Sequence, residues 1–213
     1  MQIGGLQKLS LIDYPGTPAA VIFTQGCNMF CPYCHNPQLV YPSLFEKALN
    51  ENEILHFLKK RQGLLKGVVL TGGEPTLQND LCNFIKKIKN LKFLVKLDTN
   101  GTSPEILQEL IREKLIDFVA MDIKSSDEKY KLFFKGNLNL IMQSLYVIKS
   151  SDTAHIFRTT YDTDILNKRD LDEIKATTEN SEYIVQKCRK QFNNPRGRAD
   201  VRQKILSADV SYT

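Results

Sequence analysis

Short apolar runs rich in β-branched and aromatic residues recur along the chain, and stretches with helical periodicity separate them. The apolar runs cover residues 19–24, 67–71, 93–99, 118–124, 155–161 and 183–187. Such alternation of strands and helices predicts an α/β fold with about six parallel strands. A partial, open βα barrel fits this pattern, and a doubly wound sheet would show the same periodicity.

Two of the intervening stretches carry clear helix signals. Residues 79–90 place Leu81, Phe84, Ile85 and Ile88 on one face, as an amphipathic helix requires. Residues 103–114 begin with Ser103, a suitable N-cap, and Pro104 stands at the first helical position. Both stretches are therefore predicted to be helices.

Polar residues follow almost every predicted strand. Because functional groups gather at the carboxyl ends of parallel strands, we expect these side chains to share one rim. The candidates are Cys27, Glu74, Asp98, Asp122 and Lys124, with Arg158 as a further candidate.

Length and composition limit the class of protein. With 213 residues, 42% of them apolar, we expect a single domain over residues 1–213. Five cysteines, three of them clustered, do not resemble a secreted disulfide framework and favour a reducing cytoplasm. The chain begins without a signal-peptide pattern and nowhere carries eighteen consecutive apolar residues, so we expect no membrane partner.

The net charge of +5 is modest, and part of it lies near the C-terminus. Residues 187–204 carry seven basic side chains and one acidic one, which suits an acidic protein surface or nucleic acid. Because no stacking aromatics or binding motif accompany these charges, no nucleic-acid partner is expected. The role of the tail from about residue 190 cannot be read from its sequence.

Three cysteines, Cys27, Cys31 and Cys34, stand in the spacing C-x3-C-x2-C within the loop 26–36, here called the cluster loop. Structural zinc normally takes four protein ligands, often in two separated pairs, and neighbouring Cys34 and His35 would converge poorly on one ion. Buried apolar cysteines are a further alternative, although a loop with proline and asparagine is poor core material. An iron–sulfur cluster held by three thiolates would keep one iron open for an exogenous ligand.

The combination of C-x3-C-x2-C, Tyr33 before the third cysteine, and TGGEP at residues 71–75 resembles the radical S-adenosylmethionine (SAM) superfamily. The further stretches LSLIDYPG, CHNP, LDTNG and MDIK resemble its glycyl-radical-enzyme activating branch, most like the activating proteins of anaerobic ribonucleoside-triphosphate reductase. The resemblance is strong over residues 1–125 and weak beyond them. It implies a partial βα barrel of the radical SAM type.

The resemblance also implies roles for individual residues. Cys27, Cys31 and Cys34 would bind three irons of a [4Fe–4S] cluster, and the amino and carboxylate groups of SAM would chelate the fourth. The implied SAM contacts are Tyr33, Gly72, Gly73, Glu74, Asp98, Asp122 and Lys124, with a monovalent cation as a possible extension between Asp98, Thr99 and Asp122. Turn or cap aspartates are the plain alternative for Asp98 and Asp122.

By the same resemblance, the protein cleaves SAM reductively to a 5′-deoxyadenosyl radical that takes hydrogen from a glycine of a partner enzyme. The implied partners are a glycyl-radical enzyme, specifically anaerobic ribonucleoside-triphosphate reductase, and a flavodoxin- or ferredoxin-type electron donor. A radical SAM enzyme acting on a small molecule or a peptide is an alternative. A non-catalytic iron–sulfur electron carrier is another, but it leaves the polar strand ends unexplained.

Overall fold

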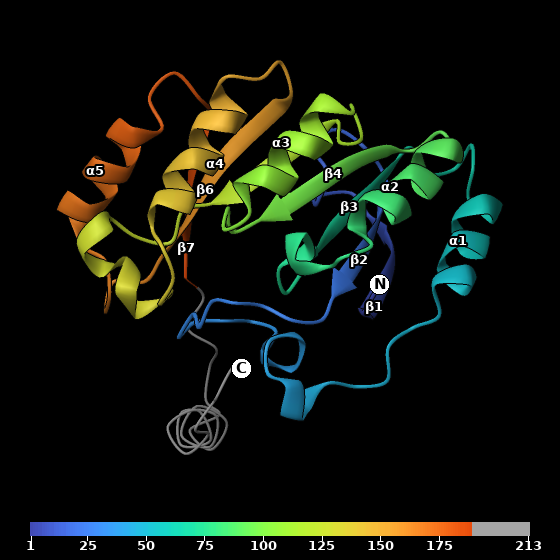
Figure 1. Ribbon diagram of the computed structural model, residues 1–213, viewed down its shortest axis with the longest axis horizontal. Helices are drawn as coiled ribbons and strands as arrows, with labels where there is room; N and C mark the ends of the chain where they lie inside the picture. The colour runs from blue at the N-terminus through green and yellow to red at the C-terminus, as the bar shows by residue number, and fades with distance from the viewer. Residues whose placement is uncertain (189–213) are drawn as a thin grey trace.

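The computed structural model describes residues 1–188, and they form one seven-stranded sheet flanked by helices (Figure 1). The strand order β1-β2-β3-β4-β5-β6-β7 follows the chain, so each strand pairs with its sequence neighbour. Strands β2 to β7 are parallel, and β1 pairs antiparallel with β2. With β1 and β7 as its edges the sheet stays open, which confirms the predicted open α/β architecture.

Six strands coincide with the six predicted apolar runs. These six are β2 (Ala19–Thr24), β3 (Gly67–Gly72), β4 (Leu94–Thr99), β5 (Phe118–Asp122), β6 (Ala154–Tyr161) and β7 (Tyr183–Lys187), and they follow a further strand, β1 (Ile3–Ser10). The helices are α1 (Glu51–Lys60), α2 (Leu81–Asn90), α3 (Pro104–Arg112), α4 (Asn139–Lys149) and α5 (Lys168–Thr177). Short 3-10 turns lie at η1 (Pro37–Leu39), η2 (Pro42–Leu44), η3 (Pro75–Leu77) and η4 (Asp127–Leu132).

Strand β1 is the element that the sequence pattern did not predict. Two adjacent glycines, Gly4 and Gly5, and the exposed polar pair Gln7 and Lys8 weaken the apolar alternation on which strand prediction relies. Its pairing with β2 is also irregular, with register shifts on both sides of residues 5–7. The strand therefore depends on tertiary pairing more than on its own sequence.

The five α-helices found within residues 1–188 cover one face of the sheet (Figure 1). Alternate strand residues, such as Val95 and Leu97 of β4, join the helices in one large apolar core. The opposite, concave face carries a smaller apolar cluster of Tyr14, Ala19, Val21 and Val69, with Phe23 and Phe118 at its margin. Helices on a single face exclude the doubly wound alternative, because that fold places helices on both faces.

The predicted apolar face of α2 is confirmed, since Leu81, Phe84, Ile85 and Ile88 are all buried. Ser103 and Pro104 occupy the predicted positions at the start of α3, although the serine side chain makes no capping hydrogen bond. Among the described residues, no helix is long and apolar enough to cross a membrane. The basic tail from about residue 190 lies outside the described residues.

Candidate functional site

Five neighbouring strands, β2 to β6, end at one edge of the sheet, and the residues at their ends surround a cavity, here called the strand-end cavity. It is lined by Cys27, Met29, Cys31, Cys34, Val40, Thr71, Gly72, Gly73, Glu74, Asp98, Thr99, Asn100, Asp122, Lys124 and Arg158. The enclosed volume is about 110 Å³, below the several hundred Å³ of most ligand pockets. A larger ligand would therefore extend from it onto the open concave side.

The cluster loop forms the wall that carries sulfur. All three of its cysteines line the cavity. Three thiolates on one wall suit a polynuclear cluster, in which each thiolate would bind a different iron. Burial raises the pKa of Cys27 to about 12 and also raises those of Cys31 and Cys34, so the thiolates form as metal displaces their protons.

Hydrogen bonds join the cluster loop to neighbouring elements. Asn28 donates to Thr102 Oγ1 across 2.9 Å and accepts from Asn100 Nδ2, also across 2.9 Å, so the loop is joined to the segment after β4. On its other side, the Phe30 N–H donates to the carbonyl of Phe133 across 2.9 Å. These contacts fix the loop between the sheet and η4.

The two glycines after β3 permit a close approach between main chains. A Cβ at Gly73 would lie 2.0 Å from the carbonyl oxygen of Gly26, and Gly72 has φ +112, a conformation that favours glycine. The Gly73 N–H donates to Thr24 O across 2.8 Å, and the Glu74 N–H donates to Gly26 O across 2.7 Å. The glycine pair thus joins the end of β3 to the start of the cluster loop.

The Glu74 side chain is 1% exposed and its carboxylate is almost saturated with hydrogen bonds. Oε1 accepts from Thr76 N at 3.1 Å, Thr76 Oγ1 at 2.6 Å and Thr99 Oγ1 at 2.8 Å, and Oε2 accepts from Asn100 N at 2.6 Å. Burial raises its pKa, and these hydrogen bonds oppose that rise. The Glu74 carboxylate therefore joins its own turn to the end of β4 and retains little free acceptor capacity.

Charged side chains of alternating sign form the opposite wall. Arg158 Nε donates to Asp122 Oδ1 across 2.8 Å, and its Nη2 lies 3.5 Å from Asp98 Oδ2. Lys124 Nζ donates to Asp122 Oδ2 across 2.9 Å. Although burial alone would raise the pKa of Asp122, Arg158 and Lys124 hold it well below the ordinary range. Asp122 is thus a carboxylate that stays ionised and holds two cations in place.

Most of the candidate residues meet in this cavity. Tyr33 does not line it: the centroid of its ring lies 5.8 Å from that of Phe133, in an apolar cluster that also holds Cys188. The buried Tyr33 hydroxyl has no hydrogen-bond partner within residues 1–188. Cys188 likewise lies behind the cluster loop and not in the cavity. Asn100 was not predicted, although it follows Asp98 and Thr99 within LDTNG and could have been found from that motif.

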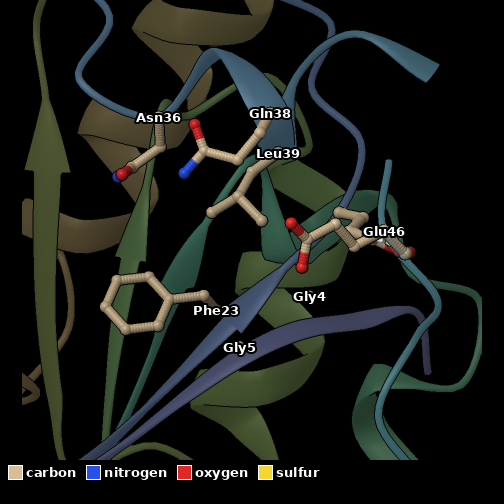
Figure 2. A pocket seen from close by; sticks show the side chains of 8 residues that line it. Gly4, Gly5, Phe23, Asn36, Gln38, Leu39 and Glu46 are labelled. Carbon is tan, nitrogen blue, oxygen red and sulfur yellow. Dashed lines mark hydrogen bonds between the residues drawn. The ribbon is translucent and has the colours of Figure 1, made fainter. Parts of the chain in front are cut away.

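The concave side holds a second cavity, of about 270 Å³, beyond the cluster loop (Figure 2). It is lined by Phe23, Leu39 and the two adjacent glycines of β1, and by the polar residues Gln25, Asn36, Gln38 and Glu46. None of the residues that line this second cavity is a cysteine, in contrast to the strand-end cavity.

The donor set of the strand-end cavity fits the two groups that the sequence resemblance implies. Three sulfur donors occupy one wall, as a cluster with one open iron requires. Three carboxylates and two cations line the rest. SAM carries a sulfonium, an ammonium and a carboxylate, so its groups of either sign find an opposite charge on this wall.

Comparison with known proteins agrees with this assignment. Residues 21–180 match the Radical SAM superfamily. A Methanocaldococcus jannaschii protein named as a glycyl-radical enzyme activating enzyme is 37% identical over 192 residues, which cover 86% of this chain and 78% of that protein. A Pyrococcus horikoshii protein named as a probable GTP 3′,8-cyclase is 33% identical over 133 residues, covering 60% of this chain and 42% of that protein.

Among solved structures, Streptococcus suis SuiB bound to S-adenosylmethionine aligns with a TM-score of 0.64 at 16% identity, over 87% of this chain and 47% of SuiB. At that identity the likeness concerns the fold alone. The family match covers three quarters of the chain and agrees with the open sheet and with the cysteine wall of the cavity. The protein is a member of the radical SAM superfamily.

Proposed function

We propose that this radical SAM protein is an activating enzyme that generates a glycyl radical on a partner enzyme. The observation that carries the proposal is the 37% identity, over 86% of the chain, to a protein named as a glycyl-radical enzyme activating enzyme. The motifs LDTNG and MDIK support it, since Asp98, Asp122 and Lys124 from these stretches all line the strand-end cavity.

In this proposal Cys27, Cys31 and Cys34 hold a [4Fe–4S] cluster whose fourth iron is left to the amino and carboxylate groups of SAM. When bound and reduced, the cluster would supply the electron for cleavage of SAM to methionine and a 5′-deoxyadenosyl radical, which would take a hydrogen atom from a partner glycine. The cluster loop contributes three thiolates and its attachments to β4 and η4. The buried wall excludes water from the reacting atoms.

The remaining residues orient SAM. Lys124 would pair with the methionine carboxylate and Asp98 would accept from the ribose hydroxyls, while the backbone of Gly72 to Glu74 would bind the ammonium. Because four hydrogen bonds already occupy the Glu74 carboxylate, we assign it mainly to holding that backbone in place. Tyr33 supports the cluster loop from behind.

A monovalent cation between Asp98, Thr99 and Asp122 stays a prediction. Arg158 already provides positive charge between the two aspartates. The proposal therefore does not require the cation, and a cation at this point would compete with the guanidinium.

The proposed partner is anaerobic ribonucleoside-triphosphate reductase, and the proposed electron donor is a flavodoxin or ferredoxin in a reducing cytoplasm. The test combines the anaerobically reconstituted protein, a reductant, SAM and the partner labelled with deuterium at glycine Cα. The proposal expects a glycine-centred electron paramagnetic resonance signal on the partner and deuterium in 5′-deoxyadenosine. Cleavage of SAM with neither label transfer nor a partner-centred signal would contradict it.

A second candidate is a radical SAM enzyme that acts on a small molecule. The similarity to the Pyrococcus horikoshii protein favours it, although that match covers 60% of the chain against 86% for the activating-enzyme relative. The same assay decides between the two: deuterium transferred to 5′-deoxyadenosine from a labelled nucleotide, with no partner protein present, would favour the small-molecule enzyme.

A further inference from the structure

Lys96 is a buried lysine on the concave face of β4, outside the residues that line the strand-end cavity. Its side chain is 3% exposed, and lysine is almost never fully buried unless it is paired. Strand alternation puts Val95 and Leu97 in the helix-covered core and turns Lys96 to the same side as Asp98. The Lys96 ammonium donates to Asp98 Oδ1.

The surroundings of Lys96 give no packing reason for a charge. In the sheet register it lies between Val69 of β3 and Phe118 of β5, both in the small apolar cluster of the concave face. Within residues 1–188, Asp98 is the only ion-pair partner of the ammonium. A long apolar side chain would fill this position without the cost of removing an ammonium from water.

Asp98 is the link between Lys96 and the cavity. Oδ1 accepts from Lys96, while Oδ2 lies 3.5 Å from Arg158 Nη2. Ala120, which is directly opposite Asp98 in the register of β5, is small enough to let Arg158 of β6 reach across that strand. Asp98 is thus held from two directions, and removing Lys96 would leave it with one support.

We propose that Lys96 is a positioning residue for the bound nucleoside: it fixes the carboxylate of Asp98 in the orientation that receives the ribose hydroxyls of SAM. This inference rests on the proposed function, because it takes Asp98 as a SAM contact. Lys96 itself touches no substrate. Its charge serves ligand binding, and the fold does not depend on it.

The test compares Lys96→Met, Lys96→Gln and Lys96→Arg in the reconstituted protein. The dissociation constant of S-adenosylhomocysteine, which carries the ribose, is measured by calorimetry, and unfolding by urea is followed in parallel. Loss of a charge-assisted hydrogen bond predicts about tenfold weaker binding for the Met and Gln variants. Lys96→Arg should restore most of the affinity. Lys96→Met should lose some stability but still unfold in one cooperative urea transition, because Arg158 remains beside Asp98.

A second ligand and a control variant separate positioning from general damage. Methionine, which has no ribose, should perturb the cluster's electron paramagnetic resonance spectrum equally in Lys96→Met and parent protein. The control is Lys89→Met, which removes the ion pair between Lys89 and Asp117, 2.7 Å apart and outside the cavity. This variant should bind S-adenosylhomocysteine with unchanged affinity.

Three outcomes would overturn the inference. They are unchanged affinity in both neutral variants, equal loss of methionine and S-adenosylhomocysteine binding, or unfolding of both neutral variants, which would make Lys96 a structural residue. Failure of the parent protein to bind S-adenosylhomocysteine or SAM would instead contradict the proposed function. The two failures are therefore distinguishable.

Discussion

The carboxylate of Glu74, just after β3, accepts a hydrogen bond from the backbone N–H of Asn100, just after β4, across 2.6 Å. This bond and the one from Thr99 Oγ1 join two neighbouring strand ends. Because Asn100 also donates to Asn28 of the cluster loop, the same connection extends to the cysteine wall. Glu74 thus helps to place both walls of the strand-end cavity.

The first prediction concerns Glu74→Gln. Its amide group would place donors against the N–H of Asn100 or the hydroxyls of Thr76 and Thr99, so we expect unfolding to become easier by about 1–3 kcal/mol. SAM binding should weaken in the same variant. Urea unfolding and calorimetry check these effects, and unchanged values in both would show that the carboxylate does not organise the cavity.

The second prediction concerns the cluster. Serine in place of Cys27, Cys31 or Cys34 should each abolish stable [4Fe–4S] incorporation, because three thiolates are already a minimal ligand set. Cys82→Ser, on α2 outside the cavity, is the matched control and should keep full iron and sulfide content. Zinc alone in the parent protein, or normal iron in all three variants, would refute the assignment.

The third prediction uses the close approach at Gly73. Alanine there would place a methyl group 2.0 Å from Gly26 O, so the cluster loop must shift at a cost of about 1–3 kcal/mol. We expect lower stability and reduced cluster loading. Gly5→Ala is the control, since its Cβ would make an ordinary contact 3.6 Å from the Phe23 ring. Equal behaviour of the two variants would contradict the steric account.

The fourth prediction concerns Asp170, which forms a capping box with Asn167 at the start of α5. Burial would raise its pKa, but hydrogen bonds from Asn167 N, Lys129 and Ser126 lower it below the ordinary 3.8. Because the pKa of Asp170 is lower in the folded state than in the unfolded chain, ionised Asp170 contributes its full stabilisation above pH 3.8. This contribution is lost as the pH falls through the folded-state pKa.

We therefore expect Asp170→Ala to lower the free energy of unfolding by about 1–2 kcal/mol near pH 7 and to reduce the loss of stability on acidification. Urea titrations between pH 7 and pH 3 measure both effects. Asp172→Ala, exposed on the same helix, serves as the control and should change neither. An unaltered acid dependence in Asp170→Ala would show that the capping box carries no such linkage.

Local sequence was sufficient to find the parallel strands and most of the cavity wall. The runs at β2 to β6 are apolar because one sheet face packs against the helices and part of the other face carries the small apolar cluster. The residues after these runs share a rim because parallel strands end at the same edge. The spacing of Cys27, Cys31 and Cys34 is local as well, so a single loop supplies all three sulfur atoms of the cavity wall.

The tertiary structure alone decided which side chains meet. Strand β1 forms because β2 offers it an edge, and neither Tyr33 nor Cys188 reaches the cavity because both pack against Phe133. The links from Glu74 to Asn100, and from Lys96 through Asp98 to Arg158, depend on the register of separate strands and on the small Ala120 between them. Spacing along the chain fixes contacts within a loop or strand. Contacts between strands require the register and the curvature of the folded sheet.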